Sequence, residues 1–331
     1  MDWQQLFPAY APLKDDEQSL LVTSFGETVA DYPALSNNTV VSTNYRGFIQ
    51  LNGPDSEKFL QGQVTCDLGQ LSEHSLLNGA HLTPKGRVVF LFTVHKDKHD
   101  NLLLETHPSV VELAIASLQK YAVFFKTTIT NVSKQFHSVI VSGPMTERLM
   151  DRFSRYSIRP ISPSNFCISF ISTRLQYEIG PLFENMTPAG QGYSDLIRVR
   201  SGGADVLEQT SEQYIVQMIN LVAQGYINFK KGCYTGQEIV ARAHYRGSVK
   251  RRMYRLTLPT KILPLAGENL TDAAGKTLGI VVGSARASDT HVEILATLAL
   301  TSTDCPKMGF ENIQPVDVSI LPLPYDIPDT P

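Results

Sequence analysis

The octet Lys231-Gly232-Cys233-Tyr234-Thr235-Gly236-Gln237-Glu238 is the most informative stretch of this chain. Thr235 and Glu238 have the spacing of a capping box, so a helix is predicted to begin there, just after Cys233. The positive end of that helix and the two lysines before the cysteine would favour the thiolate over the thiol. The alternative is a buried structural cysteine in a glycine-containing turn.

The segment before the octet carries a helical pattern. Thr210 is a candidate N-cap, and Gln213 completes a capping box with it. Five apolar residues then follow at helical spacing: Tyr214, Ile215, Met218, Ile219 and Val222. Gly225 is a candidate C-terminal stop. The alternating residues 226–229 predict a short strand between this helix and the octet.

The composition is that of a folded protein with about two domains, or three small ones. The chain has 331 residues, of which 42% are hydrophobic and 18% charged, and its net charge is −3. This charge argues against a protein that binds polyanions over its whole surface. No stretch approaches the ~18 apolar residues of a membrane span. The N-terminus lacks the features of a signal peptide, so we expect a cytoplasmic protein with no membrane partner.

Four cysteines lie far apart in the sequence, at positions 66, 167, 233 and 305, without a C-x-x-C pair. This spacing predicts neither a zinc site nor a thioredoxin-like site. Disulfides are not expected in a reducing compartment. We therefore expect no metal site formed by this chain alone, while a metal cluster shared through Cys233 with a partner stays open. Cys66 and Cys167 are expected in the core, and Cys305 in a loop.

Two regions of different character are expected, residues 1–248 and 249–331. In the first, strands are predicted at 46–51, 88–94, 101–106 and 139–142, helices at 54–62 and 108–121, and a loop at 154–165. These elements lack a regular βαβ alternation, which favours an α+β fold. In the second, strand-like segments at 253–258, 276–284, 291–300 and 314–321 are separated by glycine and aspartate turns. That pattern predicts a small antiparallel β-barrel or sandwich.

A basic segment follows the cysteine. Seven of the 29 lysines and arginines fall between Lys230 and Arg252, with Glu238 as the one acid among them. Such a local field attracts an anion: a folate tail, a phosphate backbone or an acidic partner. Lys230, Arg246 and Lys250 are the residues that we expect to bind it. The alternative is a solvated charged segment that joins two domains.

Three segments together resemble the YgfZ folate-binding family, whose members are relatives of the glycine-cleavage T-protein. They are the stretch 229–243, which contains the octet, the stretch 53–65, and Lys85-Gly86-Arg87. The ending at 321–325 also fits, so the similarity covers residues 40–325. The octet is highly specific, and the other segments are moderately so.

The resemblance implies a T-protein-like module of two intertwined subdomains around a central folate channel, followed by the barrel. It implies binding of tetrahydrofolate or a derivative, and support of iron–sulfur proteins or their assembly factors, including enzymes that modify tRNA. The key residue of the family corresponds to Cys233. Residues implied for folate binding and the motif are Lys231, Gly232, Tyr234, Thr235, Gly236, Gln237, Glu238, Arg242, Arg46, Tyr193, Ser194 and Arg200.

The chain departs from the family pattern at several of these positions. Some members place an aromatic residue against the folate where this chain has Arg46 and Ser194, and here Tyr45 and Tyr193 are merely adjacent. A carboxylate that some relatives carry is replaced by Arg200. An arginine there would hold a pterin differently, or would pair with a glutamate tail.

The sequence allows two other functions. A folate-dependent aminomethyltransferase needs an acidic residue in the strand after the glycine turn, and residues 85–90 contain no carboxylate. A protein that binds tRNA directly through the basic segment should lose affinity steeply with salt. We therefore expect an accessory protein rather than a conventional enzyme, although the sequence leaves a catalysed step open.

Overall fold

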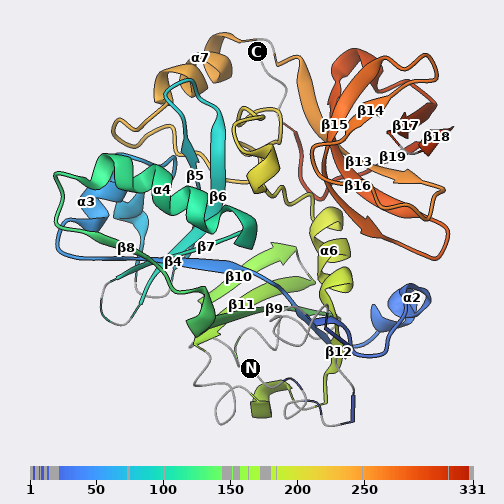
Figure 1. Cartoon of the computed structure of the whole chain (residues 1–331), viewed down its shortest axis with the longest axis horizontal. Coiled ribbons are helices and arrows are strands. Elements are labelled where there is room, and N and C mark those ends of the chain that lie inside the picture. The colour runs from blue at the N-terminus through green and yellow to red at the C-terminus, as the bar shows by residue number, and fades with distance from the viewer. Residues whose placement is uncertain are drawn as a thin grey trace.

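The computed structural model describes residues 22–72, 75–97, 101–143, 157–162, 164–171, 180–183, 185–247, 249–311 and 313–327, as well as positions 3, 7, 9–10, 13–14, 99 and 151. Two five-stranded sheets, one seven-stranded sheet and a two-stranded ribbon make up its sheet structure (Figure 1). Mixed helix and sheet content agrees with the expected α+β class.

The first five-stranded sheet is antiparallel and lies on the left in Figure 1, in the order β5-β6-β7-β4-β8. Its strands are β4 (Gly47–Asn52), β5 (Leu77–Leu82), β6 (Val88–Lys96), β7 (Leu102–Thr106) and β8 (Thr128–Asn131). Helices α3 (Ser56–Gln61) and α4 (Val111–Ala122) accompany it, with short 3₁₀ turns at Leu68–Gln70 and Pro108–Val110. Buried side chains such as Phe59, Leu118 and Phe90 form one apolar cluster between sheet and helices.

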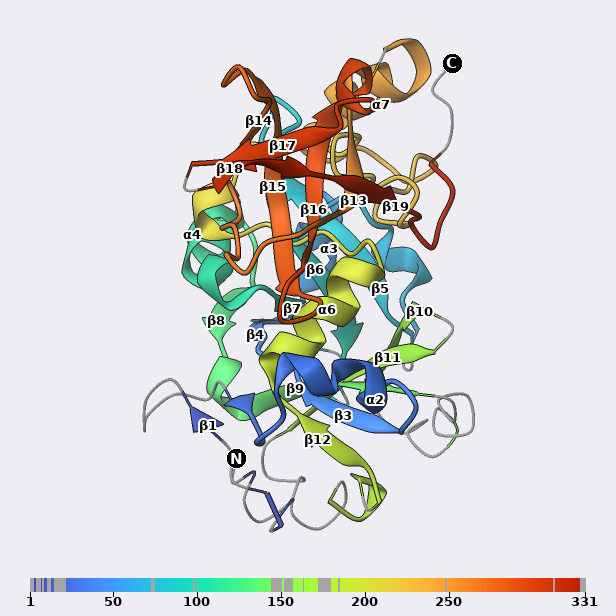
Figure 2. The same cartoon turned by 90° about the vertical axis from the view of Figure 1, so that its right-hand side faces the viewer.

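The second five-stranded sheet is mixed, in the order β10-β11-β9-β3-β12, and only β12 runs parallel to its neighbour. Its strands are β3 (Val40–Thr43), β9 (Phe136–Ser142), β10 (Ser157–Ser162), β11 (Asn165–Ile171) and β12 (Thr187–Ala189). Smaller elements beside it are β1 (Leu13–Lys14), β2 (Val22–Ser24), α2 (Tyr32–Leu35) and 3₁₀ turns at Val29–Asp31, Ser133–Gln135 and Gly180–Phe183. Helix α6 (Gln191–Arg200) lies between this sheet and the C-terminal one (Figure 2).

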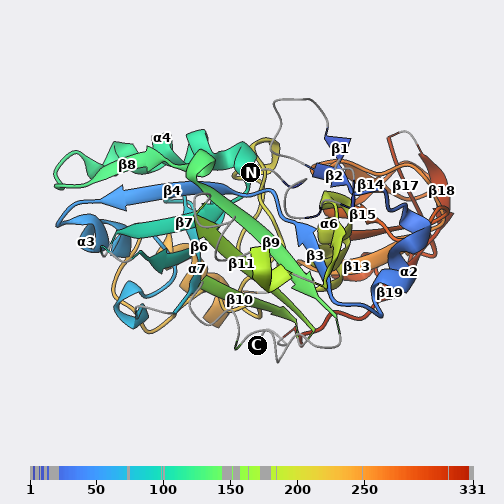
Figure 3. The same cartoon turned by 90° about the horizontal axis from the view of Figure 1, so that it is seen from below.

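The chain crosses between the two five-stranded sheets twice. Residues 44–46 join β3 of the second sheet to β4 of the first, and residues 132–135 lead back from β8 to β9. Each sheet is therefore assembled from segments that are distant in sequence. Both crossings meet near the centre of the molecule (Figure 3), where Asn44 of the first bonds to Ser138 on β9.

The C-terminal region is one curled antiparallel sheet in the order β18-β17-β14-β15-β16-β13-β19 (Figure 2). Its strands are β13 (Arg251–Leu258), β14 (Asn269–Thr271), β15 (Thr277–Arg286), β16 (Val292–Ala299), β17 (Lys307–Phe310), β18 (Ile313–Asp317) and β19 (Ser319–Leu321), with a 3₁₀ turn at Leu300–Ser302. The first three predicted strand regions are confirmed, and the fourth, 314–321, holds two strands, β18 and β19, at opposite ends of the sheet. The sequence did not predict β14 and β17. Among the described strands, β18 and β19 are the two edges of this sheet and do not pair with each other. The curled sheet is therefore a half-barrel and not the closed barrel that was expected.

One apolar cluster holds this sheet to the rest of the molecule. It includes Leu91 from β6, Leu196 from α6, and Val282 and Leu295 from β15 and β16. Because these side chains share one core, the C-terminal sheet packs as part of a continuous body.

The helix predicted over 210–225 and the strand at 226–229 are wrong. The structure has only a 3₁₀ turn at Glu208–Thr210 and then irregular turns, with left-handed φ angles at Glu212 and Asn220. Backbone bonds to Val88 replace the helical ladder. Tyr214 and Ile219 pack into the core from turns, and Met218 packs against it, so their helical spacing reflects burial from turns rather than one helix face.

The loop predicted over 154–165 is also wrong where that range is described. Residues 157–162 form β10 and pair with β11. Pro160 misled the prediction, because proline breaks the interior of a sheet but is tolerated on an edge strand such as this one.

Candidate functional site

Helix α7 (Gln237–Arg246) begins at the end of the octet, after Cys233 as predicted, but the capping box does not form. The N-cap is Gly236 in a left-handed conformation with φ 82°, and it makes no side-chain cap. A side chain at this position would collide with the Thr83 carbonyl, whose oxygen lies 2.6 Å from a Cβ placed there. The Thr235 hydroxyl instead lies 3.3 Å from Oε1 of Gln63.

The three segments that carry the family resemblance meet at the octet. The backbone N–H of Thr235 donates to the Gly62 carbonyl, which lies in the 53–65 stretch. Gly86 packs against Ile239 of α7 so closely that a Cβ on it would lie 2.9 Å from that side chain. The three sequence motifs therefore form one structural unit, in which the stretch 53–65 and the turn at Gly86 both pack against the stretch 229–243.

Lys231 is buried and fixes this junction. Its ammonium group donates to three carbonyl oxygens, those of Gln61, Val64 and Cys66, at 2.6–2.7 Å. It also lies 5.2 Å from the centre of the Tyr234 ring. Burial lowers the pKa of Lys231 to about 8, opposed by the nearby Cys66 and Asp67. Its three donors are used by backbone carbonyl oxygens, which gives Lys231 a structural role. The prediction that its positive charge favours the Cys233 thiolate stays a prediction.

Cys233 itself is exposed, and so are Gly232 and Lys230 beside it. Three rings form an aromatic cluster nearby: Phe229 stacks on His244 at 4.0 Å, and Tyr245 meets both edge-on. The exposed cysteine excludes the alternative of a buried structural residue. Its thiolate character and its reactivity stay predictions.

Cys66 and Cys167 are buried, as predicted, and Cys305 is partly exposed. The basic residues of the segment divide into two groups. Lys230, Arg242, Arg246 and Lys250 are exposed, as is the acid Glu238. Arg252 is buried and donates to the Gln217 carbonyl. The exposed basic residues thus lie on α7 or on the segments next to it in sequence, whereas Arg251 and Arg252 belong to β13 of the C-terminal sheet.

A cavity of about 640 Å³ lies away from the octet, between α6, the turn 107–109, the loop 263–266 and strand β15. Its lining joins apolar side chains such as Leu207 and Leu295 to the polar groups of Gln191, Asp195 and Arg198. Tyr45, 40% exposed, lines it together with a neighbouring cavity of about 810 Å³ beneath the crossing segments. Cys233 belongs to the lining of neither.

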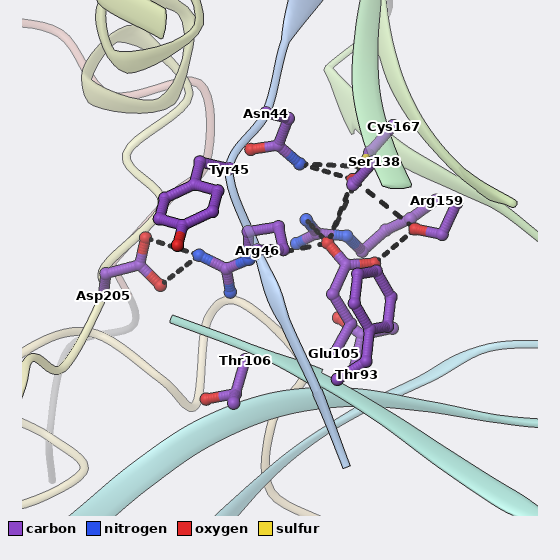
Figure 4. Close-up of polar contacts among 12 residues, drawn as sticks. Asn44, Tyr45, Arg46, Thr93, Glu105, Thr106, Ser138, Arg159, Cys167 and Asp205 are labelled. Carbon is purple, nitrogen blue, oxygen red and sulfur yellow. Dashed lines mark hydrogen bonds and ion pairs between the residues drawn. The ribbon is translucent and has the colours of Figure 1, made fainter. Parts of the chain in front are cut away.

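A buried charge cluster stands beside this cavity (Figure 4). Nη1 of Arg46 donates to both oxygens of Asp205 at 3.0 Å, and its Nε lies 3.5 Å from Glu105. Arg198 on α6 also donates to Asp205, at 2.9 Å, and Arg159 on β10 lies 3.7 Å from Glu105. The cluster thus ties the crossing segment to both sheets and to α6.

Hydroxyl groups complete the cluster around Glu105. Ser169 and Ser138 both donate to this carboxylate. Burial alone would raise the pKa of Glu105, but the charges of Arg159 and Arg46 hold it below its usual range. Burial likewise opposes ionisation of Asp205, and Arg46 and Arg198 overcome it, so its pKa is also lowered.

The residues implied for folate binding are scattered. Arg46 is in the charge cluster. Tyr193 is buried against Tyr32, and Ser194 donates to Ser42 in the core. Arg200 pairs with Glu293 of β16 at 2.9 Å. Their roles toward folate stay predictions, but only Arg46 lines one of the described cavities.

Sequence reasoning missed the side chains that do line the 640 Å³ cavity. The sequence identifies Tyr45 only as a neighbour of Arg46, and it does not predict a role for Asp195, Arg198 or Asp205. The sequence does contain one signal for two of these side chains. In a helix, residues three apart lie on the same face, so Asp195 and Arg198 would point the same way from α6. No group of three or more metal-binding side chains occurs in the described part of the chain.

We predict that Lys231→Met destabilises the protein by roughly 3 kcal/mol, because buried carbonyl oxygens lose their donor. Lys230→Met is the matched control, since Lys230 is exposed and its loss should change stability by less than about 0.5 kcal/mol. Urea unfolding of both variants checks this. Equal midpoints for the two would refute the structural role of Lys231.

We predict that the charge cluster makes the fold acid-labile. Glu105 and Asp205 have lowered pKa values in the folded state, so their stabilisation is present above the ordinary carboxyl pKa of about 4 and is lost as the pH falls below it. Asp205→Asn should cost about 3–5 kcal/mol at pH 7 by removing the buried carboxylate that Arg46 and Arg198 share. It should also flatten the loss of stability as the pH falls from 5 through the ordinary carboxyl pKa of about 4 and below it, as measured by urea unfolding. An unchanged acid limb in this variant would contradict the assignment.

The chain is similar in sequence to several known proteins and in fold to a solved structure. No family model matches it. A tRNA-modifying protein YgfZ from Aliivibrio fischeri is 29% identical over 280 residues, which are 80% of this chain and 86% of that protein. The protein of the same name from Escherichia coli O157:H7 is 32% identical over 265 residues, 74% of this chain and 80% of that protein.

Among solved structures, the glycine cleavage system aminomethyltransferase T from Bartonella henselae superimposes with a TM-score of 0.67. It covers 92% of this chain and 91% of its own, at 14% identity, so the likeness is one of fold. None of the helices in the described residues has the length and apolar character needed to cross a membrane. The relatives above 30% identity span more than two thirds of this chain and of their own length, and the T-protein-like fold agrees with them, so this chain belongs to the YgfZ family.

Proposed function

We propose that this protein binds tetrahydrofolate or a derivative and supports tRNA modification in the cytoplasm, by assisting the assembly or repair of iron–sulfur clusters. The observation that carries the folate assignment is the 640 Å³ cavity within a T-protein-like fold. The names of the relatives support the link to tRNA modification. The proposal describes an accessory protein, without a required catalytic turnover.

The cavity offers the contacts that a folate needs. Folate has a flat pterin, a benzoyl ring and an acidic tail, and ligand sites typically combine apolar walls with a few convergent polar groups. Tyr45 supplies an aromatic face at the cavity wall. Asp195 supplies a carboxylate that could accept hydrogen bonds from the amino and N–H groups of a pterin. Burial raises the pKa of Asp195, with Arg198 opposing this effect.

We assign the ligand to this cavity and not to the larger one of about 810 Å³. The larger cavity lies between the crossing segments and is lined by residues such as Lys134, Gln135 and Glu112. The smaller cavity is bounded by α6 and by the C-terminal sheet, so a bound ligand would contact both. Binding there would therefore stabilise the packing of the sheet against α6.

Cys233 would act at a different place from the ligand. It is exposed beside α7 and does not line the folate cavity. A partner protein could therefore reach the sulfur while folate stays bound. The exposed Ile239, Tyr245 and basic side chains of α7 surround it with a surface of mixed apolar and positive character.

The structure disfavours aminomethyl transfer and is compatible with direct tRNA binding. Residues 88–90 lie in β6 and are buried apolar side chains, so this strand supplies no acid for aminomethyl transfer. Direct tRNA contact keeps some support, because Arg242, Arg246 and Lys250 are exposed near one another in sequence. It stays a secondary candidate, since the same surface suits an acidic protein.

Titration of the full-length protein with 5-formyltetrahydrofolate tests the folate proposal. We expect saturable binding, and Tyr45→Ala should weaken it by roughly 1 kcal/mol, or about fivefold in Kd, through loss of ring contact. Tyr121→Ala is the matched control, because Tyr121 is also 40% exposed and lies on α4 outside the cavity. Absence of binding to the unaltered protein would end the proposal.

We predict that Cys233→Ser keeps the fold and folate binding but abolishes cellular function. Serine is close in size but cannot supply a thiolate. Thermal unfolding and folate titration check the first part, and the level of modified tRNA in cells lacking their own YgfZ checks the second. Cys305→Ser, at a partly exposed cysteine of the C-terminal region, should remain active. Full activity of the Cys233 variant would refute the role of the sulfur.

A further inference from the structure

The end of helix α4 carries a patch of exposed apolar side chains, which we name the α4 tip. It consists of Phe124, which is 94% exposed, Val123, which is 75% exposed, and Tyr121, which is 40% exposed. Single exposed apolar residues are normal on a protein surface, but neighbouring ones that form a patch mark an interaction site. None of the three lines the cavity of about 640 Å³ or that of about 810 Å³.

The turn after α4 is fixed to the rest of the fold. The Phe125 ring points inward and packs against Phe59 of α3, with the ring centres 5.3 Å apart. The backbone N–H of Lys126 donates to the Asp55 carboxylate at 2.8 Å, and the Lys126 carbonyl accepts from the Asp55 N–H at 3.3 Å. The outward position of the α4 tip is therefore set by the fold and is not that of a free loop.

Positive charge flanks the α4 tip. Lys120 and Lys126 are exposed and lie before and after it in sequence, and positions 113–130 contain no acidic residue. Two acids lie at the start of the neighbouring helix α3, but Asp55 accepts the Lys126 N–H and Glu57 pairs with a lysine of β6 at 2.8 Å. The α4 tip is therefore an apolar patch with a basic rim.

Side-chain contacts connect the α4 tip to the octet. The Tyr121 ring meets the His81 ring edge-on, with the ring centres 6.4 Å apart. Nδ1 of His81 lies 2.9 Å from the Gln63 carbonyl oxygen, and Oε1 of Gln63 lies 3.3 Å from the Thr235 hydroxyl. Thr235 is two residues from the exposed Cys233. Because a standard interface buries about 800 Å² on each partner, one bound protein can cover the tip and reach the sulfur.

We propose that the α4 tip is the docking surface for the partner protein that reaches Cys233, and that this partner presents an apolar segment flanked by acidic side chains. The inference rests on the proposed function, which requires a protein partner at the exposed sulfur. Protein interfaces combine an apolar centre with a polar rim, and a few central side chains, aromatic ones above all, supply most of the binding energy. The two lysines would attract the partner's carboxylates and speed its association.

Other occupants fit the α4 tip less well. A second copy bound through a two-fold axis would bring the lysines of both copies together, and like charges repel. A nucleic acid is bound mainly by cations on its phosphates, whereas the centre of this patch is Val123 and Phe124. Electrostatic binding to an anionic membrane typically takes a cluster of about four or more basic residues, and only Lys120 and Lys126 flank the tip within positions 113–130.

Val123→Ser combined with Phe124→Ser tests the surface in cells that lack their own YgfZ. We expect the level of modified tRNA to fall roughly tenfold, because the centre of the interface is lost. Thermal unfolding and 5-formyltetrahydrofolate titration of the purified variant should match the unaltered protein, since both replaced side chains are exposed and lie outside the folate cavity. Ile320→Ser, at an exposed side chain of β19 in the C-terminal sheet, is the matched control and should keep full activity.

Lys120→Glu combined with Lys126→Glu tests the charge of the partner, and it carries the test if the serine variant does not fold. This variant should also lose activity, while Lys120→Gln combined with Lys126→Gln should lose less. The photoreactive p-benzoylphenylalanine, substituted for Phe124, should cross-link in cells to one protein, and the glutamate pair should abolish that adduct. Peptide mapping of the adduct should locate an apolar segment next to Asp or Glu residues.

Three results would overturn the inference. If the serine and glutamate variants are both fully active while Cys233→Ser is inactive, the partner docks elsewhere and the proposed function stands. If the unaltered protein does not restore modified tRNA in the cells, the proposed function fails and the docking assignment fails with it. If the purified protein binds phosphatidylglycerol vesicles or tRNA, or sediments as a dimer, and the serine variant does not, then the α4 tip has a different occupant.

Discussion

The bonds from Arg46 to Asp205 and Glu105 are the interaction on which the architecture depends. Arg46 lies in the three-residue crossing that carries the chain from one five-stranded sheet to the other. Its partners come from β7 of the first sheet and from the loop after α6. Burial of these charges is costly unless they are paired and hydrogen-bonded, so the segments must meet in one arrangement.

That constraint also shapes the cavities. Arg198 and Asp205, which belong to the charge cluster, also line the 640 Å³ cavity. Tyr45, the residue before Arg46 in the same crossing, lines the 640 Å³ cavity. A structural cluster and a binding surface are therefore made from one short segment, which limits how far either can change alone.

The octet depends on a second buried cation. Lys231 gathers carbonyl oxygens from the end of α3 and the turn after it, and Gly236 lets α7 begin close to the β5–β6 turn. Cys233 lies between these two fixed points and stays exposed. The rigid support on both sides gives an accessible sulfur a defined position, which a cysteine in a free loop would lack.

The sequence by itself determined the elements whose pattern is local: the strands with strong alternation, helices α3, α4 and α7, and the strand-rich C-terminal region. It also determined the family, because the octet is unusual in type and spacing. It misread residues 210–229, since turns can bury apolar side chains at helical spacing when the surrounding core lies on several sides. Only the tertiary structure decided the charge cluster and the cavities. Arg46, Glu105, Arg159 and Asp205 are far apart along the chain, and their pairing follows from how the two sheets exchange segments, which no local pattern encodes.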